Sequence, residues 1–181
     1  MLLALSALAA DLQAGDLVFH RSASRQSEAI ARATHSDLTH VGVVLEREGR
    51  LRVFEAVQPV GWAEIDDWTS RGRGLEIRRL EGLAGDALGR MQALAVEWTG
   101  RPYDAGFSWT DDRLYCSELV WKLFDRAAGV RLGELRRLRD FDLADPLVGA
   151  ALRERYGARV PMDEPVIAPV DLARDPRLVE P

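Results

Sequence analysis

The chain has 181 residues, of which 47% are hydrophobic, and a formal net charge of −5 from 24 basic and 29 acidic side chains. This length fits one domain with a sizeable core. The absence of a basic run or of interleaved aromatic and basic residues excludes a typical nucleic-acid-binding protein. The single cysteine, Cys116, rules out an intramolecular disulfide and a cysteine-based zinc site, and with histidines elsewhere it suits a thiol nucleophile.

Residues 1–10, M-L-L-A-L-S-A-L-A-A, form an apolar run that is too short to span a bilayer. The run resembles the apolar core of a secretory signal, with A-L-A at 7–9 as a small-x-small cleavage site, although a basic leader is missing. We expect either a signal-peptide remnant, and hence a periplasmic or secreted protein, or a capping helix in a cytoplasmic protein. Residues 11–181 then form a single domain.

In chain order, the first half predicts a strand over 16–20, a helix from the Ser24 cap to about Thr34, and strands over 39–45 and 51–57.

The second half predicts a strand over 75–80, a helix over 88–98, a helix that begins at Cys116, and a helix from Asp145-Pro146 to about 156. The proline-rich tail after residue 161 is expected to wrap the surface in extended form. This order predicts an α+β fold, with helices packed against a small, mostly antiparallel sheet.

The helix that begins at Cys116 has apolar residues spaced i, i+3, i+4, i+7, i+8 and i+11, which is the stripe of an amphipathic helix. At its first turn, unpaired backbone N–H groups and the helix dipole favour negative charge, which lowers a thiol pKa below about 8.5. The same N–H groups can form an oxyanion hole. The alternative is a structural thiol, because free cysteine is among the most buried residue types.

The two strands upstream predict a hairpin that brings His40 and Glu55 together. With Glu48-Gly49 as a two-residue turn, Gly42 lies opposite Glu55. His40 is then the diagonal neighbour of Glu55 on the same face of the sheet. Glu55 interrupts an apolar row, and a buried carboxylate needs a partner. Gly42 in a strand interior indicates a close approach, which we expect from a helix terminus. A base, an orienting carboxylate and a thiol make an activated nucleophile.

Both hairpin residues also have simpler interpretations. His40 can be a core histidine whose ring bonds to backbone groups, and Glu55 can lie on an exposed edge or pair with Arg52 or Arg78. Taken together with Gly42 and the thiol at a helix start, the catalytic interpretation is favoured.

A second use of these residues is metal binding. His35, Asp37 and His40 supply three nitrogen and oxygen ligands for zinc with one open position, although nothing in the sequence shows that they converge. The preferred interpretation has no metal and no cofactor. We expect His20 to be structural and Glu118 to be a solvated helix charge.

Two motifs carry a resemblance to a known family. The loop G-R-P-Y at 100–103, followed by Y-C-S-E-L-V at 115–120, resembles the signature of NlpC-type cysteine hydrolases. Here the histidine strand precedes the cysteine, which resembles the circularly permuted papain-fold branch and in particular the YiiX-like proteins. Further blocks extend the likeness over most of the chain, namely G-D-L-V-F, S-E-A-I-A-R-A-T-H-S-D-L-T-H-V-G, V-F-E-A-V, S-W-T-D-D-R and F-D-L-A-D-P-L-V.

The resemblance implies a papain-like core in which Cys116 is the nucleophile, His40 the base and Glu55 the orienting residue, with a thioester acyl-enzyme intermediate. Tyr103 and Tyr115 are candidates to line the acyl pocket, the alternative being core aromatic packing. Two departures lie beside the nucleophile, because Glu118 stands where the wider superfamily often has glycine and Tyr115 where it often has aspartate. Substrate preference therefore cannot be transferred from peptidoglycan hydrolases.

Three alternative functions are compatible with these sequence features. The first is a thiol hydrolase of an amide or peptide bond in a cell-wall peptide or a small amidated compound. The second is a lipid acyltransferase or esterase that uses the same Cys-His pair. The third is a binding module without turnover, which an intact Cys, His and Glu set disfavours. The expected partner is a small peptide or acylated substrate, without stable membrane insertion, and the sequence leaves the oligomeric state open.

Overall fold

The computed structural model describes residues 12–181, so the expectations for residues 1–10 lie outside the described residues and export stays a prediction. The centre is a six-stranded antiparallel sheet in the order β4-β3-β2-β1-β5-β8, and β6 pairs with β7 separately. The strands are β1 Leu17–Ser22, β2 His40–Arg47, β3 Arg50–Glu55, β4 Gly61–Ala63, β5 Gly72–Leu80, β6 Arg136–Arg137, β7 Pro165–Val166 and β8 Leu178–Val179.

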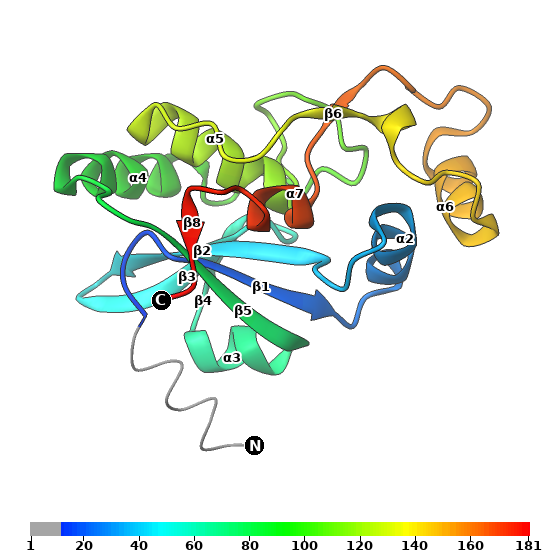
Figure 1. The fold of residues 1–181 in the computed structure, drawn as a ribbon. Coiled ribbons are helices and arrows are strands. Elements are labelled where there is room, and N and C mark those ends of the chain that lie inside the picture. The colour runs from blue at the N-terminus through cyan, green and yellow to red at the C-terminus, as the bar shows by residue number, and fades with distance from the viewer. Residues whose placement is uncertain (1–11) are drawn as a thin grey trace.

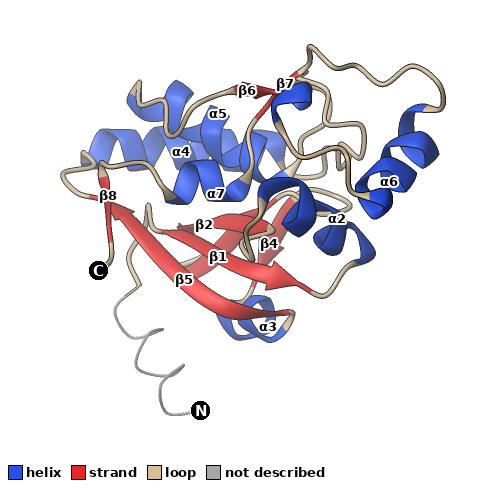
Figure 2. Ribbon diagram, turned by 45° about the vertical axis from the view of Figure 1, so that its right-hand side comes forward, coloured by secondary structure: helices blue, strands red, loops and turns tan. Residues whose placement is uncertain are grey.

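Helices cover both faces of this sheet. Figure 1 and Figure 2 show α4, α5 and α7 over one face and α3 on the opposite face, with α2 and α6 beside one end. The α+β fold with a small antiparallel sheet is therefore confirmed. The helices are α2 Arg25–Thr34, α3 Ile65–Ser70, α4 Gly85–Trp98, α5 Cys116–Ala128, α6 Pro146–Tyr156 and α7 Pro169–Ala173, with a short 3₁₀ turn at Leu138–Asp140.

The core divides into two parts, one on each face of the sheet. The larger part lies between the sheet and α4 and α5, where the predicted α5 stripe is at most 3% exposed. The smaller part lies under α3, where Trp68 packs against Val18, Val44, Val53 and Ile77. Burying large apolar side chains in this way stabilises the fold by about 1.5–3 kcal/mol for each residue. The sheet is thus held rigidly from both sides.

The predicted hairpin forms with the predicted register. Val43 pairs with Phe54 and Arg47 with Arg50, so the ladder continues to Gly42 opposite Glu55.

The expectation that a helix terminus packs over Gly42 is wrong. A Cβ at this position would lie 2.4 Å from Cγ1 of Val53 and 3.4 Å from Cβ of Glu55. Side chains of the neighbouring strand therefore occupy the space that the missing Cβ leaves.

Two predicted helix starts are confirmed by their caps, whereas the tail differs from the expectation. The Ser24 side chain accepts a hydrogen bond from the backbone of Ser27, and the Asp145 side chain does the same for Leu147. The tail does not simply wrap the surface. It forms α7 and β8, and Leu172 is fully buried because α7 packs against α5.

Candidate active site

Cys116 is the first residue of α5 and is 3% exposed. The helix start is fixed by a capping box, in which the Glu118 carboxylate accepts a hydrogen bond from the backbone N–H of Tyr115 at 3.2 Å. The Ser117 hydroxyl donates to the Ile167 carbonyl at 2.7 Å, which ties this turn to the C-terminal tail. The position of the sulfur is thus set by polar contacts on both sides.

His40 and Glu55 meet as the hairpin register predicts. Nε2 of His40 lies 2.5 Å from Oε2 of Glu55, and the Glu55 side chain is 2% exposed. Two further groups hold the same carboxylate, since the Trp68 indole N–H donates to Oε2 at 3.0 Å and Arg71 forms an ion pair with Oε1. Burial raises the pKa of Glu55, but His40 and Arg71 outweigh burial and the net change is downward.

The imidazole of His40 contacts the carboxylate of Glu55 through Nε2, which leaves Nδ1 for a second partner. The charge of Cys116 acts on the same ring. Burial alone would lower the pKa of His40, yet the hydrogen bonds and charges of Cys116 and Glu55 raise it. Burial raises the pKa of Cys116, whereas His40 and the backbone of Val41 and Ser117 lower it. The opposite net directions favour a thiolate–imidazolium pair.

His20 lies in this site, although the sequence interpretation set it aside as structural. Its ring stacks on Trp68 at 4.0 Å and lies 5.3 Å from His40. Burial and the His40 charge lower the pKa of His20 to about 4, so the ring is neutral near neutral pH. The sequence predicted neither the pairing of His20 with His40 across β1 and β2 nor the contact of His20 with Trp68.

A cavity of about 300 Å³ opens beside His40 and His20. Tyr103, one of the two predicted pocket residues, lines it and accepts a hydrogen bond from Nε2 of Gln26 at 2.8 Å. Tyr115 is 1% exposed, and its hydroxyl accepts from the backbone N–H of Ile167 at 3.2 Å. Tyr115 is outside the cavity lining, which fits the core-packing alternative for this residue.

The expectation for Glu118 as a solvated charge is wrong, because its side chain is fully buried. Nζ of Lys122 lies 2.8 Å from Oε1 of Glu118, 2.9 Å from Oδ1 of Asp111 and 2.5 Å from the Thr110 carbonyl oxygen. Burial raises the pKa of Glu118 to about 7, even though Lys122 acts in the opposite direction. Glu118 is thus a structural acid that caps the helix bearing Cys116.

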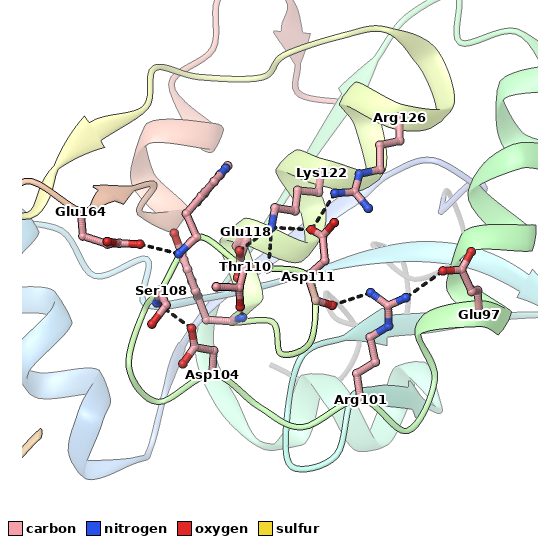
Figure 3. A network of polar contacts seen from close by, with 12 residues as sticks. Glu97, Arg101, Asp104, Ser108, Thr110, Asp111, Glu118, Lys122, Arg126 and Glu164 are labelled. Atoms are coloured by element: carbon pink, nitrogen blue, oxygen red, sulfur yellow. Dashed lines mark hydrogen bonds and ion pairs between the residues drawn. The ribbon is translucent and has the colours of Figure 1, made fainter.

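The same network holds the loop before Cys116 in place, as Figure 3 shows. Asp104 is fully buried and accepts a hydrogen bond from the backbone of Ser108 at 2.6 Å. Glu164, from the tail, accepts from the backbone of Trp109 at 2.6 Å. The loop that carries Tyr103 and leads into α5 is therefore anchored from within and by the tail.

The alternative zinc site does not form. His35 pairs with Asp142, Asp37 with Arg21, and His40 with Glu55. Across residues 12–181, no group of three or more His, Cys, Asp or Glu side chains is placed to hold a metal ion. The same residues include no helix whose length and apolar character would let it cross a membrane.

The helix α5 presents Cys116 to an antiparallel sheet, and the strand that bears His40 comes before it in the chain. This arrangement is that of the permuted papain-like fold. Comparison with known proteins agrees, since the sequence model of the family "Permuted papain-like amidase enzyme, YaeF/YiiX, C92 family" matches residues 11–180. The chain belongs to this family.

Two relatives extend the likeness over nearly the whole chain. The uncharacterized protein YiiX of Escherichia coli K12 is 41% identical over 181 residues, covering 98% of this chain and 90% of that protein. A crystal structure described as metalloprotein yiiX from Escherichia coli O157:H7 is 44% identical, with a TM-score of 0.88 and coverage of 92% of this chain and 94% of that one. The expected YiiX-like family is thus confirmed.

Proposed function

We propose that this protein is a thiol hydrolase that cleaves an amide or peptide bond through an acyl-enzyme intermediate. Cys116 is the nucleophile, His40 the general acid and base, and Glu55 the residue that orients the imidazole. The observation that carries the proposal is the contact of the His40 ring with a buried carboxylate, together with the mutual effect of His40 and Cys116, which raises the pKa of the imidazole and lowers that of the thiol.

In the first step, the Cys116 thiolate attacks the carbonyl carbon of the substrate and forms a C–S bond. The carbonyl electron pair moves to oxygen, where backbone N–H groups at the start of α5 are suited to stabilise the negative charge. When this intermediate collapses, the C–N bond breaks and His40 donates its proton to the departing nitrogen. The products are an amine and a thioester on Cys116.

In the second step, the now neutral His40 takes a proton from a water molecule that attacks the thioester. Collapse of the second intermediate breaks the C–S bond, releases a carboxylic acid and restores the thiolate–imidazolium pair. Glu55 keeps its charge throughout and stabilises the imidazolium whenever His40 is protonated.

A lipid esterase or acyltransferase is the second candidate. The cavity beside His40 includes the apolar side chains of Ile30, Ala56 and Val57, which suit an acyl chain. Either chemistry would pass through the same thioester.

Trapping the acyl-enzyme tests the proposal and separates the two candidates. The protein is incubated with muropeptides, aminoacyl amides or phospholipids, quenched in acid and examined by mass spectrometry at Cys116. A peptidyl or aminoacyl adduct that is absent from Cys116→Ala supports the amide hydrolase. A fatty acyl adduct favours the lipid enzyme. A Cys116 that acquires no adduct from any of the three classes would count against both.

A further inference from the structure

A groove of about 480 Å³ lies beside the candidate active site, between the start of α2 and the start of β5. Its lining is rich in arginine and serine and includes Arg21, Ser22, Ser24, Ser70, Arg71 and Arg73. Three of these residues, Ser22, Ser24 and Arg71, also line the cavity beside His40. The groove and the cavity are therefore adjacent, and one elongated ligand can reach from one into the other.

The groove contains two arginines in an unfavourable arrangement. Arg21 on β1 and Arg73 on β5 are direct partners in the antiparallel ladder, where like charges repel. Arg21 is neutralised by ion pairs with Glu28 and Asp37. Arg73 is exposed, and within residues 12–181 it makes no ion pair. Its charge is thus available to a ligand.

Arg71 lies between the groove and the cavity and lines both. It forms an ion pair with Glu55, and Nε points to the Asp67 carbonyl oxygen at 3.4 Å. Its side chain is nevertheless 44% exposed, so the outer part of the guanidinium faces the groove. A planar guanidinium presents several N–H donors and can bind two acceptors together.

Two hydroxyl groups at the junction are also free to donate. The Ser22 hydroxyl accepts a hydrogen bond from the backbone of Ser24 at 3.2 Å, and the Ser24 hydroxyl accepts one from the backbone of Ser27. Among the described residues neither hydroxyl donates a hydrogen bond, and accepting one leaves the O–H hydrogen of each serine available. Each can therefore donate to an anion in the groove.

The single carboxylate in the lining does not cancel this preference. Glu28 is bound by Arg21 through one oxygen and by Arg32 through the other, at 3.0 Å for Arg32. These arginines lower the pKa of Glu28, and they also neutralise its charge toward the groove. The uncompensated charge at this site is positive.

We propose that the groove is a substrate subsite that binds an anionic group, a carboxylate or a phosphate, next to the bond that Cys116 attacks. The inference rests on the proposed function and narrows its substrate class to acidic compounds. Arg73 supplies the main charge, Arg71 a second guanidinium, and Ser22 and Ser24 neutral donors. Charge-assisted hydrogen bonds of this kind are about twice as strong as neutral ones.

The test compares affinity labels of Cys116 that differ only in charge. N-iodoacetyl-β-alanine is paired with its neutral amide, and N-iodoacetyl-O-phosphoethanolamine is paired with N-iodoacetylethanolamine. We expect at least one anionic label to modify Cys116 about tenfold faster than its neutral partner, with saturation at high concentration. The faster pair identifies carboxylate or phosphate as the preferred group.

Variants of the groove test whether it causes the preference of Cys116 for anionic labels. The ratio of anionic to neutral rates should fall severalfold in Arg73→Gln, which loses the main charge, and be retained in Arg73→Lys, which keeps it. The matched control is Arg50→Gln, an equal charge change at the far end of the β2–β3 hairpin, where the ratio should stay as in the wild type.

The two proposals fail in different ways. If charged and neutral labels react equally fast with the wild type while the reaction still depends on His40, the subsite is wrong and the hydrolase proposal stands. If the ratio survives in Arg73→Gln, the groove is likewise not the source of the preference. If Cys116 reacts with none of the labels, both the proposed thiol hydrolase and the proposed subsite are contradicted.

Discussion

The ring of His20 stacks on the indole of Trp68, with 4.0 Å between the ring centroids and 22° between the ring planes. The same indole donates its N–H to Glu55, and the His20 ring faces His40. α3 thus reaches across the sheet face to hold both the carboxylate and the neighbouring imidazole. The two candidate catalytic residues of the hairpin depend on a helix that bears neither of them.

Trp68→Phe separates the indole N–H from the stacking surface, because the phenyl ring still packs against His20. Glu55 then loses one donor, and we expect a loss of about 1.5–3 kcal/mol in the free energy of unfolding. The pKa of Glu55 should rise and Cys116 should react more slowly with iodoacetamide. Urea unfolding and the alkylation rate measure both effects. Trp62→Phe is the control, since its N–H bonds only to the Thr99 hydroxyl; equal losses in both variants would refute the role of Trp68.

Gly72 makes room for His20. A Cβ at residue 72 would lie 2.4 Å from Cγ of His20 and 2.5 Å from its Nδ1. Gly72→Ala should displace the ring and reduce the free energy of unfolding by about 1–3 kcal/mol. Gly89→Ala is the matched control, because its Cβ meets nothing within 4 Å on α4 and should stabilise the protein by up to about 1 kcal/mol. Thermal unfolding that ranks the two variants in the other order would contradict this packing.

Glu118 gives the protein a pH dependence of stability with a defined sign. Its pKa is about 7 in the folded protein against 4.5 for the free side chain, so the folded state binds the proton more tightly. Its contribution is full below about pH 4.5 and is lost as the pH rises through about 7, by up to about 3 kcal/mol.

Glu118→Gln removes this pH-dependent contribution to stability, because the amide does not titrate. The amide oxygen can still accept a hydrogen bond from the backbone N–H of Tyr115. We expect the variant to lose less stability than the wild type between about pH 5 and about pH 8. Chemical denaturation at these two pH values measures the difference. Parallel stability curves for the two proteins would show that Glu118 does not titrate in this range.

Local patterns in the sequence predict the parts of the site that depend on one element or on neighbouring elements. The spacing of apolar residues places Cys116 at the start of a buried helix, and the short Glu48-Gly49 turn sets the register that joins His40 to Glu55. The helix follows from the periodic spacing of apolar residues and the hairpin register from the length of the turn, and both patterns can be recognised in short stretches of sequence. The structure adds the contact between the two elements.

The features that the sequence did not predict depend on contacts between distant segments. Trp68 in α3 and Arg71 at its C-cap reach Glu55, and no spacing in the sequence relates them to the hairpin. Glu118 has the charge of a surface residue, and only the arrival of Lys122 and the preceding loop allows it to be buried. The proline-rich tail contains α7, whose Leu172 completes the core.

The pH profile of Cys116 alkylation tests the central claim most directly. Iodoacetamide is reacted with the wild type and with His40→Ala across about pH 5 to about pH 10, and modification of Cys116 is followed by mass spectrometry.

Because His40 lowers the pKa of the thiol, the wild type should react rapidly near neutral pH. His40→Ala should be at least about tenfold slower there and recover only above about pH 8.5. Equal rates and coincident profiles for the two proteins would contradict a thiolate–imidazolium pair, and with it the proposed hydrolase.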